Sequence, residues 1–147
     1  MANGNCASIV AALPLAPIHE RFGIAKIVVM TMQAVSGAGY PGVASLDITD
    51  NVVPFIAEEE EKIERETRKI LGSLETGRVT PAPFVVSAQC HRVNVVDGHM
   101  AAVRVKLGRA ADPAELRDAF ASFTALPQEL RLPTARSRGS TAMRGGG

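Results

Sequence analysis

The chain has 147 residues, of which 46% are hydrophobic and 21% are charged, so it is long enough for one globular domain with a buried core. Lys and Arg number 16 against 15 Asp and Glu, and a net charge of +1 gives no overall field that would recruit nucleic acid or an anionic membrane. Cys6 and Cys90 lack metal-type spacing, which argues against a zinc site or a disulfide framework, and without an apolar span or a basic leader we expect a cytoplasmic protein.

The first predicted element is an apolar helix over residues 6–13. Pro14 and Pro17 are expected to end or kink this helix, because proline removes a helical hydrogen bond and clashes with the preceding turn. His19 would then lie in a loop.

A buried strand is predicted next, over residues 24–35, from the run of apolar β-branched residues that includes Ile27, Val28, Val29 and Val35. Residues 36–42 contain too much glycine for a helix or a regular strand, so they predict a loop.

A long charged helix is predicted over residues 58–71. Acidic and basic side chains recur there at i,i+4 in the favourable order, as Glu58/Lys62, Glu61/Arg65 and Glu64/Arg68. Its apolar face would consist of Ile63, Ile70 and Leu71, with Gly72 at its C-terminal cap. The acidic cluster 58–61 is by default a solvated helix face, and a positioned Glu59/Lys62 pair is the sharper alternative.

Two strands and a short helix complete the predicted elements. Residues 84–96 and 100–107 read as strands joined near Asp97-Gly98 in a hairpin, which places His99 at the start of the second strand. Asp112-Pro113-Ala114-Glu115 combines an N-cap, a proline at the first position and an acid at the third, and it opens a helix to about Phe123.

The order of these elements predicts an α+β fold. Runs of helix, strand, long helix, hairpin and helix differ from the regular alternation of an α/β protein. We expect one domain over residues 1–134. Residues 135–147 are rich in Arg and Gly and have almost no apolar side chains, so we expect a disordered tail there.

Cys6 is the strongest candidate for a nucleophile. It stands in Asn5-Cys6-Ala7-Ser8 at the opening of an apolar helix, where the helix dipole and the free amides of the first turn would stabilise a thiolate. The same amides and the Asn5 side chain could stabilise an oxyanion. The alternative is a small buried thiol that only packs, and Cys90, inside an apolar strand, fits that description better.

His99 and Arg92 are the best candidate partners of such a thiol. His99 would project from the turn after Asp97-Gly98, and Arg92 on the other arm of the hairpin could hold a carboxylate bidentately. Taken alone, a histidine at a turn is more often a solvated surface group. His19 and His91 have weaker cases, and the glycine-rich stretch 36–42 is weak support for a phosphate site because it lacks the Walker lysine.

Together these segments resemble the aspartate-semialdehyde dehydrogenase family, in its archaeal and fungal branch, over residues 2–133. Asn5-Cys6 resembles the nucleophile motif of the family, and residues 31–42, TMQAVSGAGYPG, are similar to its signature loop almost letter for letter. The pattern continues in order with LDI at 46–48, NVVP at 51–54, EEEKI at 59–63, KILG at 69–72, CHRV at 90–93 and DGH at 97–99.

The resemblance implies a phosphorylating dehydrogenase that interconverts aspartyl phosphate and aspartate semialdehyde with NADP, in lysine, threonine and methionine biosynthesis. It implies that Cys6 forms a thioacyl intermediate, that His99 is the acid/base and that Gln33 orients the thioacyl group. It also implies a mixed, mostly antiparallel sheet covered by helices on one face, as in the catalytic domain of glyceraldehyde-3-phosphate dehydrogenase.

The remaining implied roles concern substrate and cofactor. Arg92 would bind the substrate carboxylate, with Glu59 and Lys62 at its amine and phosphate, and Glu60 is nearly as good as Glu59. Ser36-Gly37 would touch the cofactor near its nicotinamide end.

Members of this family carry a nucleotide-binding Rossmann domain and a C-terminal extension that this sequence lacks, so we expect a catalytic half that is inactive alone. The family also implies a homodimer or homotetramer formed through the sheet of this domain. Two alternatives stay open: a malonyl-CoA reductase on the same scaffold, and a module that dimerises without catalysis.

Overall fold

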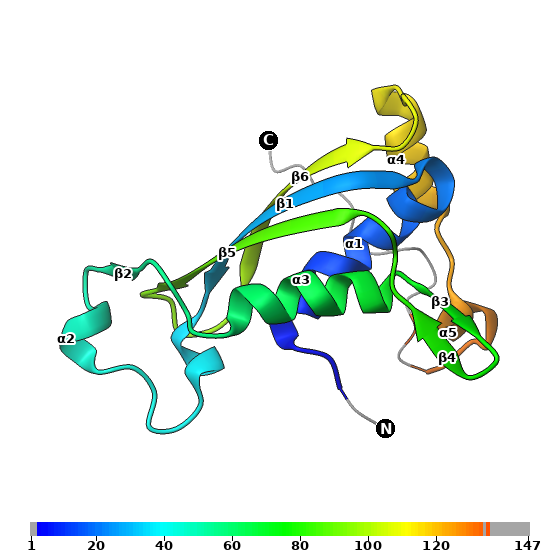
Figure 1. Ribbon diagram of the computed structural model, residues 1–147. Coiled ribbons are helices and arrows are strands. Elements are labelled where there is room, and N and C mark those ends of the chain that lie inside the picture. The colour runs from blue at the N-terminus through cyan, green and yellow to red at the C-terminus, as the bar shows by residue number, and fades with distance from the viewer. Residues whose placement is uncertain (1–2, 134, 136–147) are drawn as a thin grey trace.

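The computed structural model describes residues 3–133 and residue 135 (Figure 1). A four-stranded mixed sheet in the order β2-β5-β1-β6 forms the centre of the molecule. Its strands are β1 (Ile24–Gln33), β2 (Val52–Val53), β5 (Val85–Val93) and β6 (Met100–Leu107). The pair β1 and β5 is parallel, and the other two pairs are antiparallel. The predicted α+β class and the mostly antiparallel sheet are therefore confirmed.

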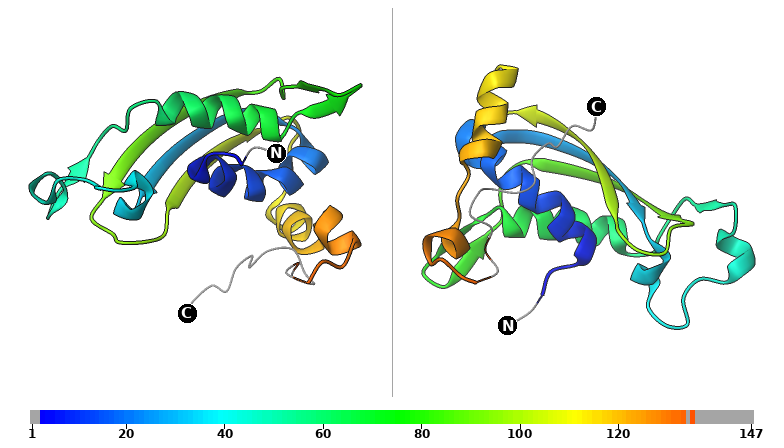
Figure 2. Two further views of the ribbon diagram at one scale, coloured as in Figure 1. Left: turned by 90° about the horizontal axis from the view of Figure 1, so that it is seen from below. Right: turned by 180° about the vertical axis from the view of Figure 1, so that it is seen from behind.

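Helices α1 (Cys6–Phe22) and α3 (Glu59–Ile70) pack against one face of this sheet and against each other (Figure 2). The core between these layers is apolar, with Leu15, Ile27, Ile63 and Phe84 at most 2% exposed. The opposite face of the sheet is open to solvent, since Val28 on β1 is 40% exposed. The predicted strand is present over residues 24–33 and is buried on one face only, because its side chains alternate between a covered and an uncovered face.

Pro14 and Pro17 were expected to end or kink the first helix; α1 continues through both, so they do not end it, and His19 lies inside the helix and not in a loop. Each internal proline costs roughly 3 kcal/mol. Leu15, Ile18 and Phe22 lie on the buried face of the last turns. Full burial of three such side chains contributes on the order of 1.5–3 kcal/mol each, a gain comparable to the cost of the two prolines.

The predicted hairpin between the last two long strands is wrong. β1 lies between β5 and β6, so the connection 94–99 crosses over the end of β1. Main-chain bonds from Val35 to Val95 and from Ser36 to Val96 hold this crossing, at 2.9 and 3.1 Å. Asp97-Gly98 is a turn signal over a few residues, and it does not specify which strand the chain pairs with next. The crossing brings the ends of β1 and β5 and the beginning of β6 to one edge of the sheet.

Helix α3 closes the edge of β5 with side chains. The Oε1 atoms of Glu60 and Glu64 accept the main-chain N–H groups of Cys90 and Ala88, each at 3.0 Å. One helical turn of four residues rises about 6 Å and two strand residues about 6.6 Å, so the two spacings match. Glu64 therefore bonds to the strand and not to Arg68. Of the predicted i,i+4 pairs, Glu58–Lys62 is formed at 3.3 Å.

Several short elements were not predicted. The 3-10 turn η1 (Val35–Ala38) leads into an arm that carries α2 (Ser45–Ile48) and β2 and projects from the sheet (Figure 1). β3 (Ser73–Glu75) and β4 (Arg78–Thr80) form a small hairpin. The predicted capping box at Asp112 opens α4 (Pro113–Ser122), and α5 (Leu126–Glu129) follows.

No helix among the described residues is long and apolar enough to span a membrane. The predicted tail 135–147 lies outside the described residues except for Ala135.

Candidate active site

Cys6 is the first residue of α1, and its side chain is exposed. Asn5 is the N-cap, and its Oδ1 accepts the N–H groups of Ala7 and Ser8 at 3.0 and 3.1 Å. The first-turn amides that the sequence suggested would be free are thus partly occupied by the cap. The start of α1 positions the thiol, and two main-chain N–H groups of its first turn are already paired with the Asn5 side chain.

The His99 side chain lies directly beside this thiol. Its Nε2 is 3.2 Å from Cys6 Sγ, although the two residues are 93 positions apart in sequence. Its Nδ1 accepts the main-chain N–H of Ala34 at 3.1 Å. Ala34, the residue after β1, thereby fixes the imidazole that precedes β6, and the thiol and the imidazole lie within hydrogen-bonding distance of each other.

Arg92 is a buried cation next to this pair, with 6% of its surface exposed. Its Nη1 donates to the Ala34 carbonyl oxygen at 2.9 Å. Within the described part of the chain no carboxylate lies within ion-pair distance of Arg92. Because a buried charge is costly unless it is paired, the free side of the guanidinium suits a ligand carboxylate or phosphate.

Gly37 lies against both of these side chains. A Cβ atom at this position would be 2.8 Å from His99 Cε1 and 3.0 Å from Arg92 Nη1. Any larger residue here would require the His99 ring or the Arg92 guanidinium to shift, since real Cβ atoms do not come this near to other heavy atoms.

Glu59 links three elements at the site. Its carboxylate accepts the Asn5 side-chain amide at 3.0 Å and the Gln33 amide at 3.2 Å. Among the acidic cluster 58–61, Glu59 faces the site and Glu60 faces the strand edge. Glu66, two turns further along α3, accepts the main-chain N–H of Asn5 at 2.7 Å. Sequence reasoning missed Glu66, although its i+7 spacing from Glu59 places both on one helix face.

Two predicted site residues stand apart from this group. Lys62 pairs with the exposed Glu58 and makes no hydrogen bond to Cys6, His99 or Arg92 among the described residues. Ser36 is exposed in η1, and its N–H donates to Val96.

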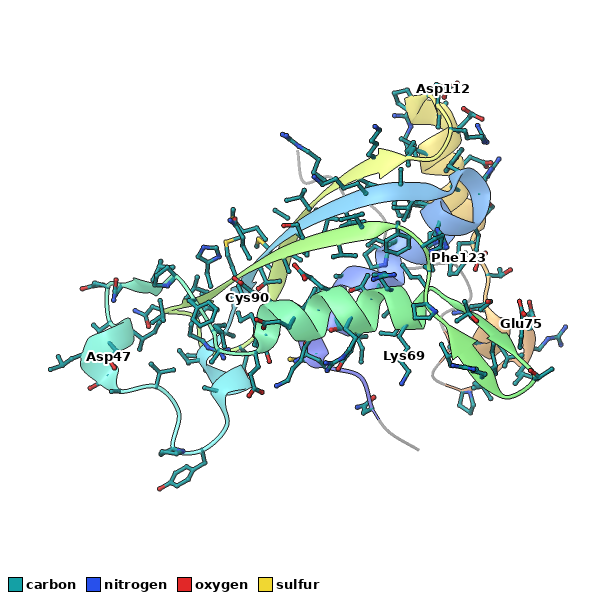
Figure 3. The ribbon with its side chains drawn as sticks, in the orientation of Figure 1. Asp47, Lys69, Glu75, Cys90, Asp112 and Phe123 are labelled. Atoms are coloured by element: carbon teal, nitrogen blue, oxygen red, sulfur yellow. The ribbon has the colours of Figure 1, made fainter. Side chains whose placement is uncertain are left out.

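Cys90 is buried in β5, where burial raises the pKa of its thiol from the ordinary value of 9.0 (Figure 3). This agrees with the prediction of a packing thiol. No cluster of three or more metal-binding side chains is present in residues 3–133.

Comparison with known proteins gives consistent matches. The family model described as "Semialdehyde dehydrogenase, dimerisation domain" matches residues 15–140. An aspartate-semialdehyde dehydrogenase of Methanothermobacter thermautotrophicus is 53% identical over 133 residues, which cover 90% of this chain and 38% of that protein. A malonyl CoA reductase (NADP) of Metallosphaera sedula is 36% identical over 132 residues, which cover 88% of this chain and 37% of that protein.

Among solved structures, aspartate semialdehyde dehydrogenase with NADP from Candida albicans matches with a TM-score of 0.74 and 36% identity, over 86% of this chain and 37% of that chain. The chain thus spans well under half the length of the proteins it matches.

Proposed function

The chain belongs to the aspartate-semialdehyde dehydrogenase family, and from that premise we propose that it supplies the catalytic half of such an enzyme, with residues 1–134 as one domain. The reaction is the NADP-dependent interconversion of aspartyl phosphate and aspartate semialdehyde through a thioacyl intermediate on Cys6. The observation that carries the proposal is the 3.2 Å approach of His99 Nε2 to Cys6 Sγ beside a buried Arg92.

Acyl transfer would begin at the exposed sulfur of Cys6. The thiolate adds to the acyl carbon of aspartyl phosphate, a carbon–sulfur bond forms, and the carbon–oxygen bond to phosphate breaks. Gln33, which is 1% exposed and held by Glu59, would orient the thioacyl group.

The charges around the thiol match the two ends of this substrate. Arg92 would bind the α-carboxylate, because its guanidinium has donors beyond the one that Ala34 accepts. Glu59 would attract the ammonium group while keeping its bonds to two amides. Lys62 would reach the phosphate only by breaking its ion pair with Glu58. Exposed ion pairs of this kind contribute about 0–1 kcal/mol, so breaking it costs little.

The part of the site that suits NADP is the exposed turn at Ser36-Gly37, which lies against His99 and carries no side chain at Gly37. NADP would accept or supply the hydride there.

A second candidate function is malonyl-CoA reduction, which the similarity to the Metallosphaera sedula enzyme favours. A malonyl group also carries a carboxylate for Arg92. The malonyl group has no ammonium group, so it would make no ion pair with Glu59.

We also propose that the chain assembles as a homodimer through the open face of its sheet, in keeping with the dimerisation domain that it matches. The exposed apolar side chains Val28, Met30 and Met100 lie on that face.

The decisive experiment is acylation of the intact chain, because this half-reaction needs no nucleotide. The chain is mixed separately with aspartyl phosphate, acetyl phosphate and malonyl-CoA, and the acylated residue is located by mass spectrometry. We expect stoichiometric acylation of Cys6 by aspartyl phosphate, with phosphate release, and none in Cys6→Ser. Faster acylation by malonyl-CoA would favour the second candidate, and no acylation by any donor would leave a module that only dimerises.

A further inference from the structure

The two ring nitrogens of His99 have different partners, and this difference determines where the ring proton lies. Nδ1 receives a hydrogen bond from the main-chain N–H of Ala34 at 3.1 Å, whereas Nε2 faces Cys6 Sγ at 3.2 Å. A main-chain N–H can only donate, so Nδ1 must be unprotonated in this arrangement. A neutral imidazole then carries its single proton on Nε2, directed at the sulfur.

The alternative protonation states require the Ala34 bond to break. If His99 were protonated on Nδ1, as the other tautomer or as an imidazolium, two N–H groups would point at one another. Ala34 is 0% exposed, so water cannot replace the lost acceptor. A buried N–H left without a partner is costly, which favours the Nε2–H tautomer.

Ala34 and Gly37 bound the His99 ring on the side of this bond. Ala34 follows β1 and is the N-cap residue of η1, with φ −65° and ψ 153°. The Ala34 carbonyl accepts Arg92 Nη1 at 2.9 Å and Gly37 N–H at 3.1 Å. Gly37 in turn lies against the His99 ring. Both polar main-chain groups of Ala34 are therefore committed to the site.

Resting on the function proposed above, we propose that Ala34 is a positioning residue that holds His99 as the Nε2–H tautomer. His99 then meets Cys6 as a hydrogen-bond donor to the thiolate and does not act as the base that removes the thiol proton. The sulfur–hydrogen bond breaks with its electron pair remaining on sulfur, and the proton leaves to water, which reaches the exposed Cys6 side chain. The Nε2–H group then stabilises the resulting anion.

The direct test is nitrogen NMR of the full chain labelled with ¹⁵N, near neutral pH. The three histidines are distinguished by single substitutions of His19 and His91. We expect His99 Nδ1 to resonate as an unprotonated ring nitrogen, Nε2 as a protonated one, and a coupling across the hydrogen bond between Nδ1 and the Ala34 amide nitrogen. A protonated Nδ1 on His99 would overturn the proposal.

A second test compares two replacements of the imidazole by the rate at which iodoacetamide alkylates Cys6, with Cys90 as an internal control. His99→Gln retains an N–H donor but cannot serve as a base, and His99→Ala has neither property. A hydrogen bond to a charged group contributes roughly 1.5–3 kcal/mol, so His99→Gln should react about tenfold faster than His99→Ala. If the alkylation rate of Cys6 falls equally in the two variants, His99 does not act as a hydrogen-bond donor.

The two proposals fail in different ways. If Cys6 is acylated by aspartyl phosphate and the acylation depends on His99, but Nδ1 is protonated, only the role of Ala34 is overturned. If His99→Ala leaves both alkylation and acylation of Cys6 unchanged, the thiol and imidazole do not cooperate, and the proposed mechanism falls together with this inference.

Discussion

The two ends of the central sheet are built in different ways. At the end where β1 and β5 stop, side-chain bonds hold the structure: Gln33 donates to Glu59 on α3, and Arg92 donates to the carbonyl oxygen of Ala34. At the opposite end, main-chain bonds from Gly108 to Gly23 and from Arg109 to Phe22, at 3.0 and 3.1 Å, close the sheet over an apolar core. The comparison suggests that the reactivity of Cys6 and the stability of the fold depend on separate regions. Substitutions at the apolar end should therefore leave the reactivity of Cys6 intact, and substitutions near Cys6 should leave the free energy of unfolding intact.

The largest effect is expected from Phe84→Ala at the apolar end. Phe84 is 2% exposed and meets the His19 ring edge-on at a centroid distance of 5.2 Å. Truncation of a buried Phe to Ala costs about 3–5 kcal/mol, measured as the free energy of unfolding in urea. The alkylation rate of Cys6 in the folded protein should stay the same, and a change in that rate would break the comparison.

At the reactive end, Arg92→Met should mainly weaken the binding of the substrate carboxylate. Removal of one partner from a buried charge interaction costs about 2–5 kcal/mol, so acylation of Cys6 by aspartyl phosphate should slow on the order of a hundredfold or more. Stability should change little, because Gly37 still donates to the Ala34 carbonyl. Acylation by acetyl phosphate, which has no α-carboxylate, is the matched control and should fall far less.

Gly37→Ala tests how tightly the reactive end is packed. The added Cβ would push on the His99 ring and on the guanidinium of Arg92. A displaced hydrogen-bond donor to a charged group loses roughly 1.5 kcal/mol, so alkylation of Cys6 by iodoacetamide should slow about tenfold. Gly39→Ala adds backbone strain in the same turn, because φ is +69° there, but no atom lies within 4 Å of its Cβ position, so it should leave the alkylation rate of Cys6 unchanged. An unchanged rate in Gly37→Ala would mean that the ring can shift without consequence.

A smaller effect is expected from Asp112→Ala, at the N-cap of α4 and far from Cys90 in Figure 3. The Asp112 carboxylate accepts the N–H groups of Ala114 and Glu115 at 2.7 and 2.8 Å. Loss of such a cap costs about 1 kcal/mol of unfolding free energy. Asp112→Asn should retain most of the unfolding free energy that Asp112→Ala loses, and neither variant should change the alkylation rate of Cys6.

The smallest effect concerns alkaline pH and Cys90. Burial raises the pKa of this thiol above 9.0, so the folded chain holds its proton more tightly than the unfolded chain does. This contribution to stability is complete below pH 9 and is lost as the pH rises further. Urea unfolding at pH 8 and pH 10 should show a smaller alkaline loss in Cys90→Ala than in the parent, and identical losses would argue against a buried titrating thiol.

Local signals in the sequence predicted local structure well, and they failed where distant segments meet. The capping box at Asp112 involves neighbours only, and it formed as expected. The order of the strands did not follow from Asp97-Gly98, because a turn can lead either to a hairpin or to a crossing. Likewise, the continuation of α1 through Pro14 and Pro17 depends on burial against the sheet, which no window of residues reveals.

The candidate site shows the same division. Cys6 and His99 were selected from their residue types and from the resemblance, while the distance between them is a property of the fold. The choice between Glu59 and Glu60 depends on the rotation of α3 against β5, which the sequence leaves open. Ala34 has no side-chain chemistry, so its two main-chain bonds could not have been inferred without the structure.

The closing of the β5 edge by Glu60 and Glu64 also bears on how the chain behaves in concentrated solution. An uncovered strand edge is a template for cross-β aggregation between molecules. Two carboxylates that occupy the amides of Cys90 and Ala88 block such pairing and place negative charge where a second strand would approach. Helix α3 therefore protects the edge of its own sheet from pairing with a second molecule. The same helix supplies Glu59 to the site, so one element serves both resistance to aggregation and the arrangement of the site.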